Sequence, residues 1–116
     1  MMEKRVDVGM LVVSNRFHVA DEYVDEFEER FRNRMGEVES MDGFVRFEFH
    51  RPVDHGHIDT ATHAAVTYWE SMDAFETWTE SEAFREAHRN PAPDEWFERE
   101  GTVEIHEVGF DAGRDR

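Results

Sequence analysis

The side chains of this sequence best suited to chemistry are Asn15, Trp78 and His88. His88 follows Phe84 by four residues, a spacing that places two side chains on one face of a helix. A neutral imidazole in an apolar pocket is a good iron ligand. Asn15 alternates with Phe17 along an expected strand, and its neutral amide carries an N–H donor that must find a partner among apolar neighbours. We therefore expect His88 on the buried face of a helix and Asn15 on the sheet face that meets the helices.

Each of the three also has a purely structural interpretation. His88 could be a core histidine satisfied by a backbone carbonyl, and its position alone favours that role by about two to one. Trp78 lies one helical turn beyond Phe75, where a core aromatic is the default. Asn15 could bond to a backbone group of the helix layer. Only the presence of all three together favours a functional site.

Other chemistries find little support. The chain has no cysteine, so disulfides, thiolate nucleophiles and Cys-ligated zinc are excluded, and it has no Gly-rich phosphate loop, nucleophile elbow or HExxH motif. Paired acids such as Glu28-Glu29 and Glu98 to Glu100 are typical of solvated faces. Four histidines flank one loop without a metal-ligand spacing, so we expect them on the solvated surface: His50, His55, His57 and His63.

Length and charge indicate one acidic domain spanning residues 1–116, with frayed termini at 1–5 and 111–116. A net charge of −15 argues against nucleic acid and anionic membranes as partners. Lys4 is the only lysine beside twelve arginines, a pattern typical of halophilic proteins, whose charges dense salt screens. Without a signal peptide or a membrane span, we expect a cytoplasmic protein.

Hydrophobic periodicity predicts the order β-α-β-β-α-α-β. The first helix should run from Asp21 to about Ser40, because apolar residues recur along it at three- and four-residue spacing. Ser71 and Ser81 should begin the two short helices. A further helical turn should lie within 94–99. The expected strands are 10–17, 44–50, 60–69 and 102–110.

This order indicates an α+β, ferredoxin-like (split βαβ) fold, with helices on one face of an antiparallel sheet. The opposite face should carry several side chains too apolar to stay in water. A second subunit packed sheet against sheet would bury them, so we expect a homodimer. The residues expected on this face are Val12, Phe44, Val66, Tyr68 and Val108.

The spacing of the three candidate residues matches a known family. Trp78 precedes His88 by ten positions, and Asn15 stands beside Arg16 in the first expected strand. Around them stand Trp69-Glu70-Ser71, Ala74-Phe75, Ser81 to Phe84 and Ala87-His88. Over nearly its whole length the chain resembles the IsdG-type haem-degrading monooxygenases of the antibiotic biosynthesis monooxygenase (ABM) superfamily, which use an Asn, a Trp and a His in this order.

The resemblance implies a dimeric α+β barrel in which haem is both substrate and cofactor. His88 would be the axial ligand of the haem iron, Trp78 would press the porphyrin out of plane, and Asn15 would stabilise oxygen. Phe75 and Phe84 would line the haem pocket. The porphyrin ring would be opened and iron released with O2, and electrons would come from an external donor, an unidentified reductase, because the chain has no flavin or nicotinamide motif.

Two alternatives remain open. One is a cofactor-independent ABM monooxygenase that oxidises an aromatic or polyketide-like substrate in the same pocket. The other is a non-enzymatic haem carrier or sensor. Arg16 should point to the opposite sheet face, so we assign it no haem propionate. The segment from Asn90 to Trp96 should form the pocket rim, where its acids would repel propionates and high salt would weaken that repulsion.

Overall fold

Four antiparallel strands form one sheet in the order β2-β3-β1-β4. The structure is a computed structural model that describes residues 9–34 and 37–113. The strands are β1 (Leu11–Val19), β2 (Phe44–His50), β3 (His63–Trp69) and β4 (Phe97–Glu107). β3 and β1 are therefore the central strands, and β2 and β4 form the edges of the sheet.

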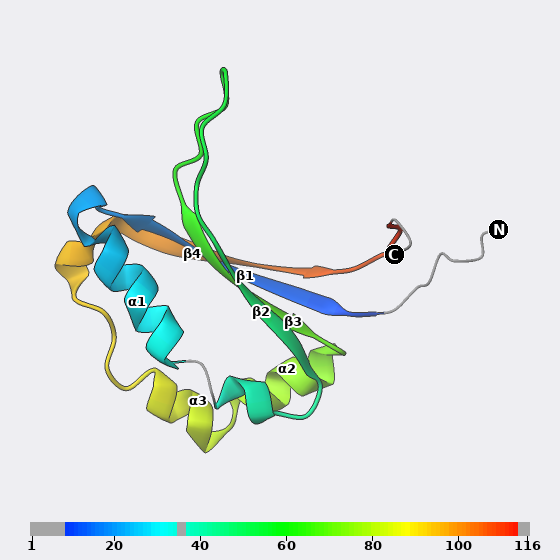
Figure 1. Ribbon diagram of the computed structural model, residues 1–116. Helices are drawn as coiled ribbons and strands as arrows, with labels where there is room; N and C mark the ends of the chain where they lie inside the picture. The colour runs from blue at the N-terminus through cyan, green and yellow to red at the C-terminus, as the bar shows by residue number, and fades with distance from the viewer. Residues whose placement is uncertain (1–8, 35–36, 114–116) are drawn as a thin grey trace.

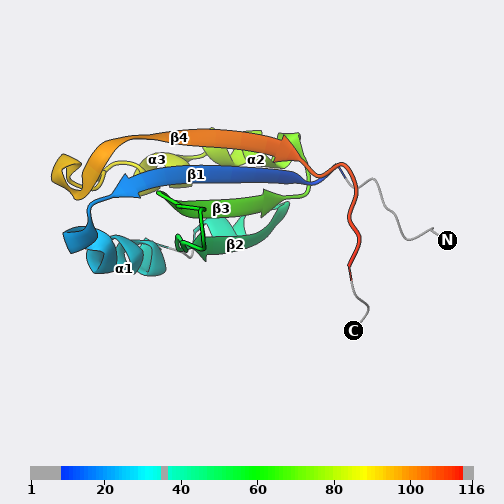
Figure 2. The same cartoon turned by 90° about the horizontal axis from the view of Figure 1, so that it is seen from above.

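All helices lie on one side of the sheet (Figure 1). They are α1 (Val24–Arg34), α2 (Met72–Thr79) and α3 (Glu82–Ala87), with 3-10 turns η2 (Asp21–Tyr23), η3 (Val38–Ser40) and η4 (Asp94–Trp96). Seen from above, α1 lies toward the β2 side and α2 and α3 toward the β4 side (Figure 2). Within the described residues no helix is long and apolar enough to cross a membrane.

The predicted element order and ferredoxin-like fold are confirmed, with shifted boundaries. The first helix was predicted to run to Ser40, but the described α1 ends at Arg34 and η3 forms a separate turn. β3 begins three residues later than expected, and β4 begins at Phe97, inside the segment predicted as helical. The predicted frayed ends at 1–5 and 114–116 lie outside the described residues, and 111–113 are exposed without regular structure.

Two aromatic clusters join the helices to the sheet. One lies under α2 and α3, where the fully buried Trp69 contacts Trp78, Phe75 and Phe44. The other lies under α1, where Phe27 is 2% exposed and contacts the rings of Phe17, Phe31, Phe49, Phe97 and His63. Apolar burial on this scale is the main driving force of the fold.

The sheet face without helices, here called the free face, is less apolar than predicted. Phe44 does not belong to it, because its ring packs edge-on against Trp69 on the helix side, with centroids 5.4 Å apart. A register shift between Phe44 and Arg46 breaks the alternation of β2 and moves Phe44 to the other face. Arg46 and Glu48 then stand on the free face beside Tyr68.

Candidate functional site

Trp78 and His88 belong to one continuous aromatic cluster. Trp78 is 9% exposed and its ring stacks on that of Trp69, with the ring centroids 6.3 Å apart and an angle of 26° between the ring planes. Its other contact is Phe84, whose ring stands perpendicular to it at 5.5 Å. The Phe84 ring in turn contacts the His88 ring, with the two ring centroids 4.0 Å apart. Phe75 packs against Trp69 instead, so it supports the cluster from the side away from His88.

His88 is exposed, so the prediction that it lies on the buried face is wrong. The reason is the length of α3, which ends at Ala87 and leaves His88 as its C-cap, with φ −104° and ψ 9°. The side chain still lies on the Phe84 side. Its Nδ1 lies 2.9 Å from the Phe84 carbonyl oxygen. A carbonyl can only accept, so Nδ1 carries a proton, and in the neutral ring the lone pair is then on Nε2.

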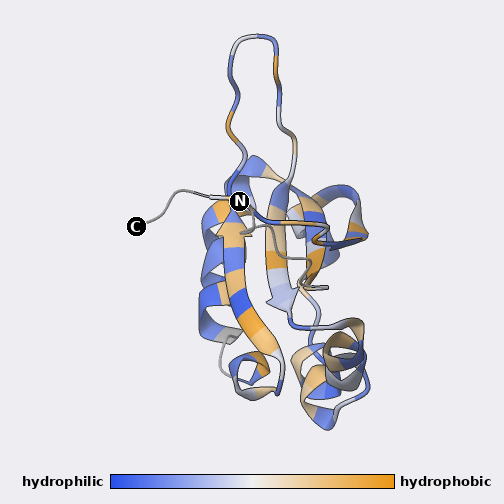
Figure 3. Cartoon of the chain, turned by 90° about the vertical axis from the view of Figure 1, so that its right-hand side faces the viewer, coloured by the Kyte–Doolittle hydropathy of each residue, from blue (hydrophilic) through white to orange (hydrophobic). Residues whose placement is uncertain are grey.

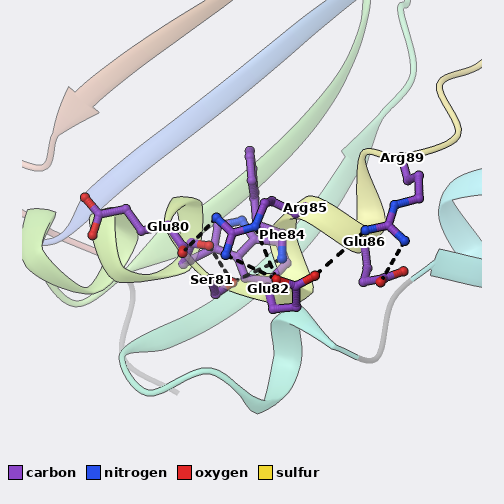
Figure 4. Close-up of polar contacts among 8 residues, drawn as sticks. Glu80, Ser81, Glu82, Phe84, Arg85, Glu86 and Arg89 are labelled. Atoms are coloured by element: carbon purple, nitrogen blue, oxygen red, sulfur yellow. Dashed lines mark hydrogen bonds and ion pairs between the residues drawn. The ribbon is translucent and has the colours of Figure 1, made fainter.

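The rest of α3 is held by its own polar contacts (Figure 4). The Ser81 hydroxyl caps the helix by accepting a hydrogen bond from the Phe84 backbone N–H at 3.1 Å, as predicted. Arg89 forms ion pairs with Glu82 at 3.8 Å and Glu86 at 3.1 Å. Arg85 pairs with Glu82 at 3.2 Å. Both arginines are therefore engaged on the outer side of the helix.

The segment that follows His88 is fixed at both ends by the α1 side of the molecule. The Arg30 guanidinium donates to the carbonyl oxygen of Asn90. At the other end, the Trp96 ring stacks on Tyr23 at 5.8 Å. These contacts hold the chain between α3 and β4 in one path and so fix the position of His88.

Asn15 lies on the helix-facing side of β1, as predicted, but in a different part of the site. Beside it is a cavity of 530 Å³ lined by Phe17, Phe97, Val103 and others. Trp78 and His88 do not line this cavity. Because Trp69 pairs with Leu11, the Trp69 end of the site lies four residues along β1 from Asn15, roughly 13 Å at strand rise.

The side-chain amide of Asn15 is unengaged. No hydrogen bond joins it to another group in the part of the chain that the structure describes. The backbone partner that a purely structural role requires is therefore not found there. Arg16 points to the free face, as predicted, where it contacts Ser14 Oγ at 3.4 Å and Glu104 at 3.4 Å.

Three further residues near Asn15 were not singled out from the sequence. Val103 and Ile105 pair with Asn15 and Val13 on the helix side of β4, yet they are 60% and 45% exposed. Arg99 also lines the cavity, and it makes no hydrogen bond or ion pair with the described residues. Alternation along 102–110 could have identified the two apolar residues, but their exposure depends on the edge position of β4.

His63 was predicted among the solvated loop histidines, and this is wrong. It is 7% exposed, its ring contacts Phe27 and Phe49, and its Nδ1 has no hydrogen-bond partner among the described residues. Burial lowers the pKa of His63, an effect that nearby Glu28 opposes and Arg51 reinforces. Among residues 9–34 and 37–113, no group of three or more His, Asp or Glu side chains is arranged to hold a metal ion.

Comparison with known proteins identifies the family of this chain. The model of the antibiotic biosynthesis monooxygenase family matches residues 10–90, well over half of the chain. This chain belongs to the antibiotic biosynthesis monooxygenase family. The match spans Asn15, Trp78 and His88 together with every helix from α1 to α3.

Several ABM relatives are named for haem degradation. A staphylobilin-producing haem oxygenase from Staphylococcus haemolyticus is 37% identical over 82 residues, covering 70% of this chain and 75% of the relative. A haem-degrading monooxygenase from Halalkalibacterium halodurans is 33% identical over 99 residues, covering 85% and 82%. The haem degrader MhuD from Mycobacterium tuberculosis, solved with two haems in its active site, has a TM-score of 0.71 and 30% identity, covering 89% of this chain and 99% of MhuD.

Proposed function

We propose that this ABM protein is a haem-degrading monooxygenase. The observation that carries the proposal is the His88 ring. It is exposed, its Nδ1 donates to the Phe84 carbonyl, and its Nε2 is free, the state in which imidazole binds iron. The names of the relatives with 33% and 37% identity support the same substrate.

The residues around Asn15 fit a large, flat, apolar ligand. Val103 and Ile105 present uncovered side chains on the helix side of the sheet, next to the cavity at Asn15. A porphyrin laid against them would remove that apolar surface from water.

Each residue then has a distinct role. Haem would supply the iron for the oxygen chemistry and would also be the substrate whose ring is opened. His88 would hold the iron through Nε2. Trp78, backed by Trp69 and Phe84, would press on the macrocycle. Asn15 would offer its amide N–H to oxygen in the pocket. Phe84 lines the pocket beside His88, and Phe75 supports Trp69.

Arg99 is the residue we assign to a haem propionate. It lines the cavity beside Asn15 and is not neutralised by a described acid, whereas Arg16, Arg85 and Arg89 all have carboxylate partners. Asp94 and Glu100 line the same cavity and would oppose the propionate. Salt would therefore weaken both the attraction of the propionate to Arg99 and its repulsion by the acids of the cavity. The acidic surface of a protein with net charge −15 suits a salt-rich cytoplasm.

The electrons for ring opening come from an external donor, which in a cell would be a reductase. The assembly is a homodimer that meets through the free face of the sheet. This arrangement follows the resemblance to the IsdG type, and it places both haem sites on the outer, helix-bearing sides of the dimer.

A haemin titration followed by ascorbate tests the proposal. We expect a shifted Soret band with the features of a histidine ligand, and bleaching of that band when ascorbate and air are supplied. Arg99→Glu should weaken haemin binding without changing the ligand-type spectrum. A stable Soret shift without bleaching would indicate a haem carrier. The lack of any shift would favour a cofactor-independent monooxygenase acting on another aromatic substrate.

A further inference from the structure

The twelve residues 51–62, between the end of β2 and the start of β3, form a projection here called the arm. In Figures 1 and 3 the arm rises from the sheet and extends away from the body of the molecule. It leaves on the side opposite the helices, which is the side of the free face (Figure 1). Any body that packs on the free face would therefore lie alongside the arm.

The arm has a defined shape. Near its tip the backbones of His55 and Ile58 exchange two hydrogen bonds, of 2.9 and 2.8 Å. Gly56 lies between them at φ 59°, a conformation that favours glycine. Lower down, the Asp54 carboxylate accepts a hydrogen bond from the Thr60 backbone N–H at 2.9 Å. These contacts pair the two halves of the arm.

The base of the arm is tied to α1. Arg51 donates through Nε and Nη2 to the two carboxylate oxygens of Glu28, at 2.9 and 2.5 Å. The Glu28 side chain is only 14% exposed, so the prediction of a solvated position for this acid is wrong, and the hydrogen bond from Arg51 lowers its pKa. A bidentate pair on a largely buried carboxylate fixes direction as well as position. The direction of the arm is thus set by α1.

The arm carries apolar side chains into solvent. Val53 is 71% exposed, the highest value among the exposed large apolar side chains of the described residues, and Ile58 is 63% exposed. Among the described residues, most of the surface of both side chains is therefore left uncovered. A shaped hairpin that presents two branched aliphatic side chains beyond the sheet is suited to contact with another folded surface.

The charge pattern of the free face identifies that surface. On this face Arg16 pairs with Glu104 at 3.4 Å and Arg46 pairs with Glu48 at 2.9 Å. These ion pairs balance two positive charges against two negative ones, while the whole chain carries −15. A second copy of so acidic a protein is repelled least where the charge is balanced. The free face is therefore suited to approach by its own copy.

We propose that the arm clasps a second copy of this chain, burying Val53 and Ile58 against the flank of the partner when two free faces pack together. The inference rests on the homodimer proposed above and adds the segment that secures it. It does not depend on haem, because neither His88 nor Asn15 lies on the arm.

The absence of cysteine from the sequence allows a direct test. Ile58→Cys would carry a nitroxide label, with Met72→Cys as a control on α2, where the side chain is 44% exposed. We expect slow, restricted motion of the label at position 58 in the haem-free protein and fast motion at position 72. Equally fast motion at both positions would overturn the clasp.

A second variant measures the contribution of the arm to assembly. Replacing residues 53–60 by Asn-Gly should leave the circular dichroism spectrum unchanged and raise the dimer dissociation constant at least about tenfold. Light scattering should then report the mass of a single chain, somewhat below the 13.8 kDa of the intact monomer, at concentrations where the intact chain is dimeric. An unchanged dissociation constant, or an intact chain that is monomeric, would overturn the proposal. Haemin binding through His88 would survive either failure, so the proposed function is tested separately.

Discussion

Each of the two aromatic clusters of this protein includes a histidine. The two histidines differ in exposure and in the hydrogen bonding of Nδ1, which are the properties that decide whether a histidine can bind a metal. His88 ends the α2–α3 cluster, is exposed, and has Nδ1 fixed on the Phe84 carbonyl. His63 lies within the α1 cluster, is 7% exposed, and has an Nδ1 that finds no hydrogen-bond partner in the part of the chain that the structure describes. An iron ligand needs an accessible lone pair on one nitrogen and a fixed proton on the other, and of these two histidines His88 meets both conditions and His63 meets neither.

Removing Trp78 should have the largest effect on stability, and its effect on bound haem should distinguish the α2–α3 cluster from the α1 cluster. Trp78→Ala leaves a cavity next to Trp69 and should cost roughly 3–5 kcal/mol in the free energy of unfolding. Bound haem should also become more planar, which resonance Raman spectra can follow, and turnover should fall. Phe27→Ala in the other cluster is the matched control, with a similar loss of stability and no change in the haem spectrum. Equal spectral changes in both variants would contradict the assignment of Trp78.

Asn15→Ala should slow ring opening without weakening haem binding. The amide has no described structural partner, so its loss removes a donor to the oxygen side of the ligand at little cost to the fold. We expect single-turnover decay of the Soret band to be slower by about 10²-fold. Ser14→Ala, on the adjacent residue and the opposite face, is the control and should decay at the normal rate. Decay at the normal rate in Asn15→Ala would make the amide a bystander.

His63 should make stability depend on pH. Burial lowers its pKa in the folded state, so below the ordinary value of 6.5 the unfolded chain binds a proton that the folded chain resists. Stability is retained above that value and lost as pH falls from it toward the lower folded pKa. His63→Phe should therefore reduce the difference between melting temperatures measured at about pH 7.5 and about pH 5.5. The exposed His57→Gln variant should keep the full difference, and an unchanged difference in His63→Phe would show that other groups cause it.

The smallest effect expected is a loss of stability when Trp69, the ring on which Trp78 stacks, loses its hydrogen-bond partner. The Trp69 indole N–H donates to Thr67 Oγ1 at 2.9 Å, and Trp69 is the ring on which Trp78 stacks. Thr67→Val leaves this buried N–H without a partner and should cost about 1 kcal/mol in urea denaturation. Thr67→Ser keeps the hydroxyl and should recover most of that loss. Equal destabilisation of both variants would point to packing of the Thr67 methyl group instead.

Periodicity was sufficient for the element order and for the side of the sheet on which Asn15 lies. The alternation of β1 is regular through Asn15, so its prediction depended on no tertiary detail. Phe44 was misplaced because a register shift next to it breaks the alternation of β2. Such irregularities arise from contacts across strands that a single segment does not encode.

The environment of the two histidines could not be obtained from spacing. A four-residue interval places His88 and Phe84 on one side of a helix, but the exposure of His88 depends on α3 ending at Ala87. His63 is the first residue of β3, directly after a loop rich in polar residues, and it is buried because the rings of Phe27 and Phe49 meet there from other elements. Burial of this kind is a property of the assembled layers.

The spectrum of bound haemin in His88→Ala tests the account most directly. The wild-type protein should give a Soret band and charge-transfer features of a histidine-ligated haem, and His63→Phe should give the same spectrum. His88→Ala should lose these features while keeping a folded circular dichroism spectrum, because the His88 side chain is exposed and lies beyond the end of α3. A His88→Ala spectrum identical to that of the wild type would contradict the account, since another residue would then be the ligand.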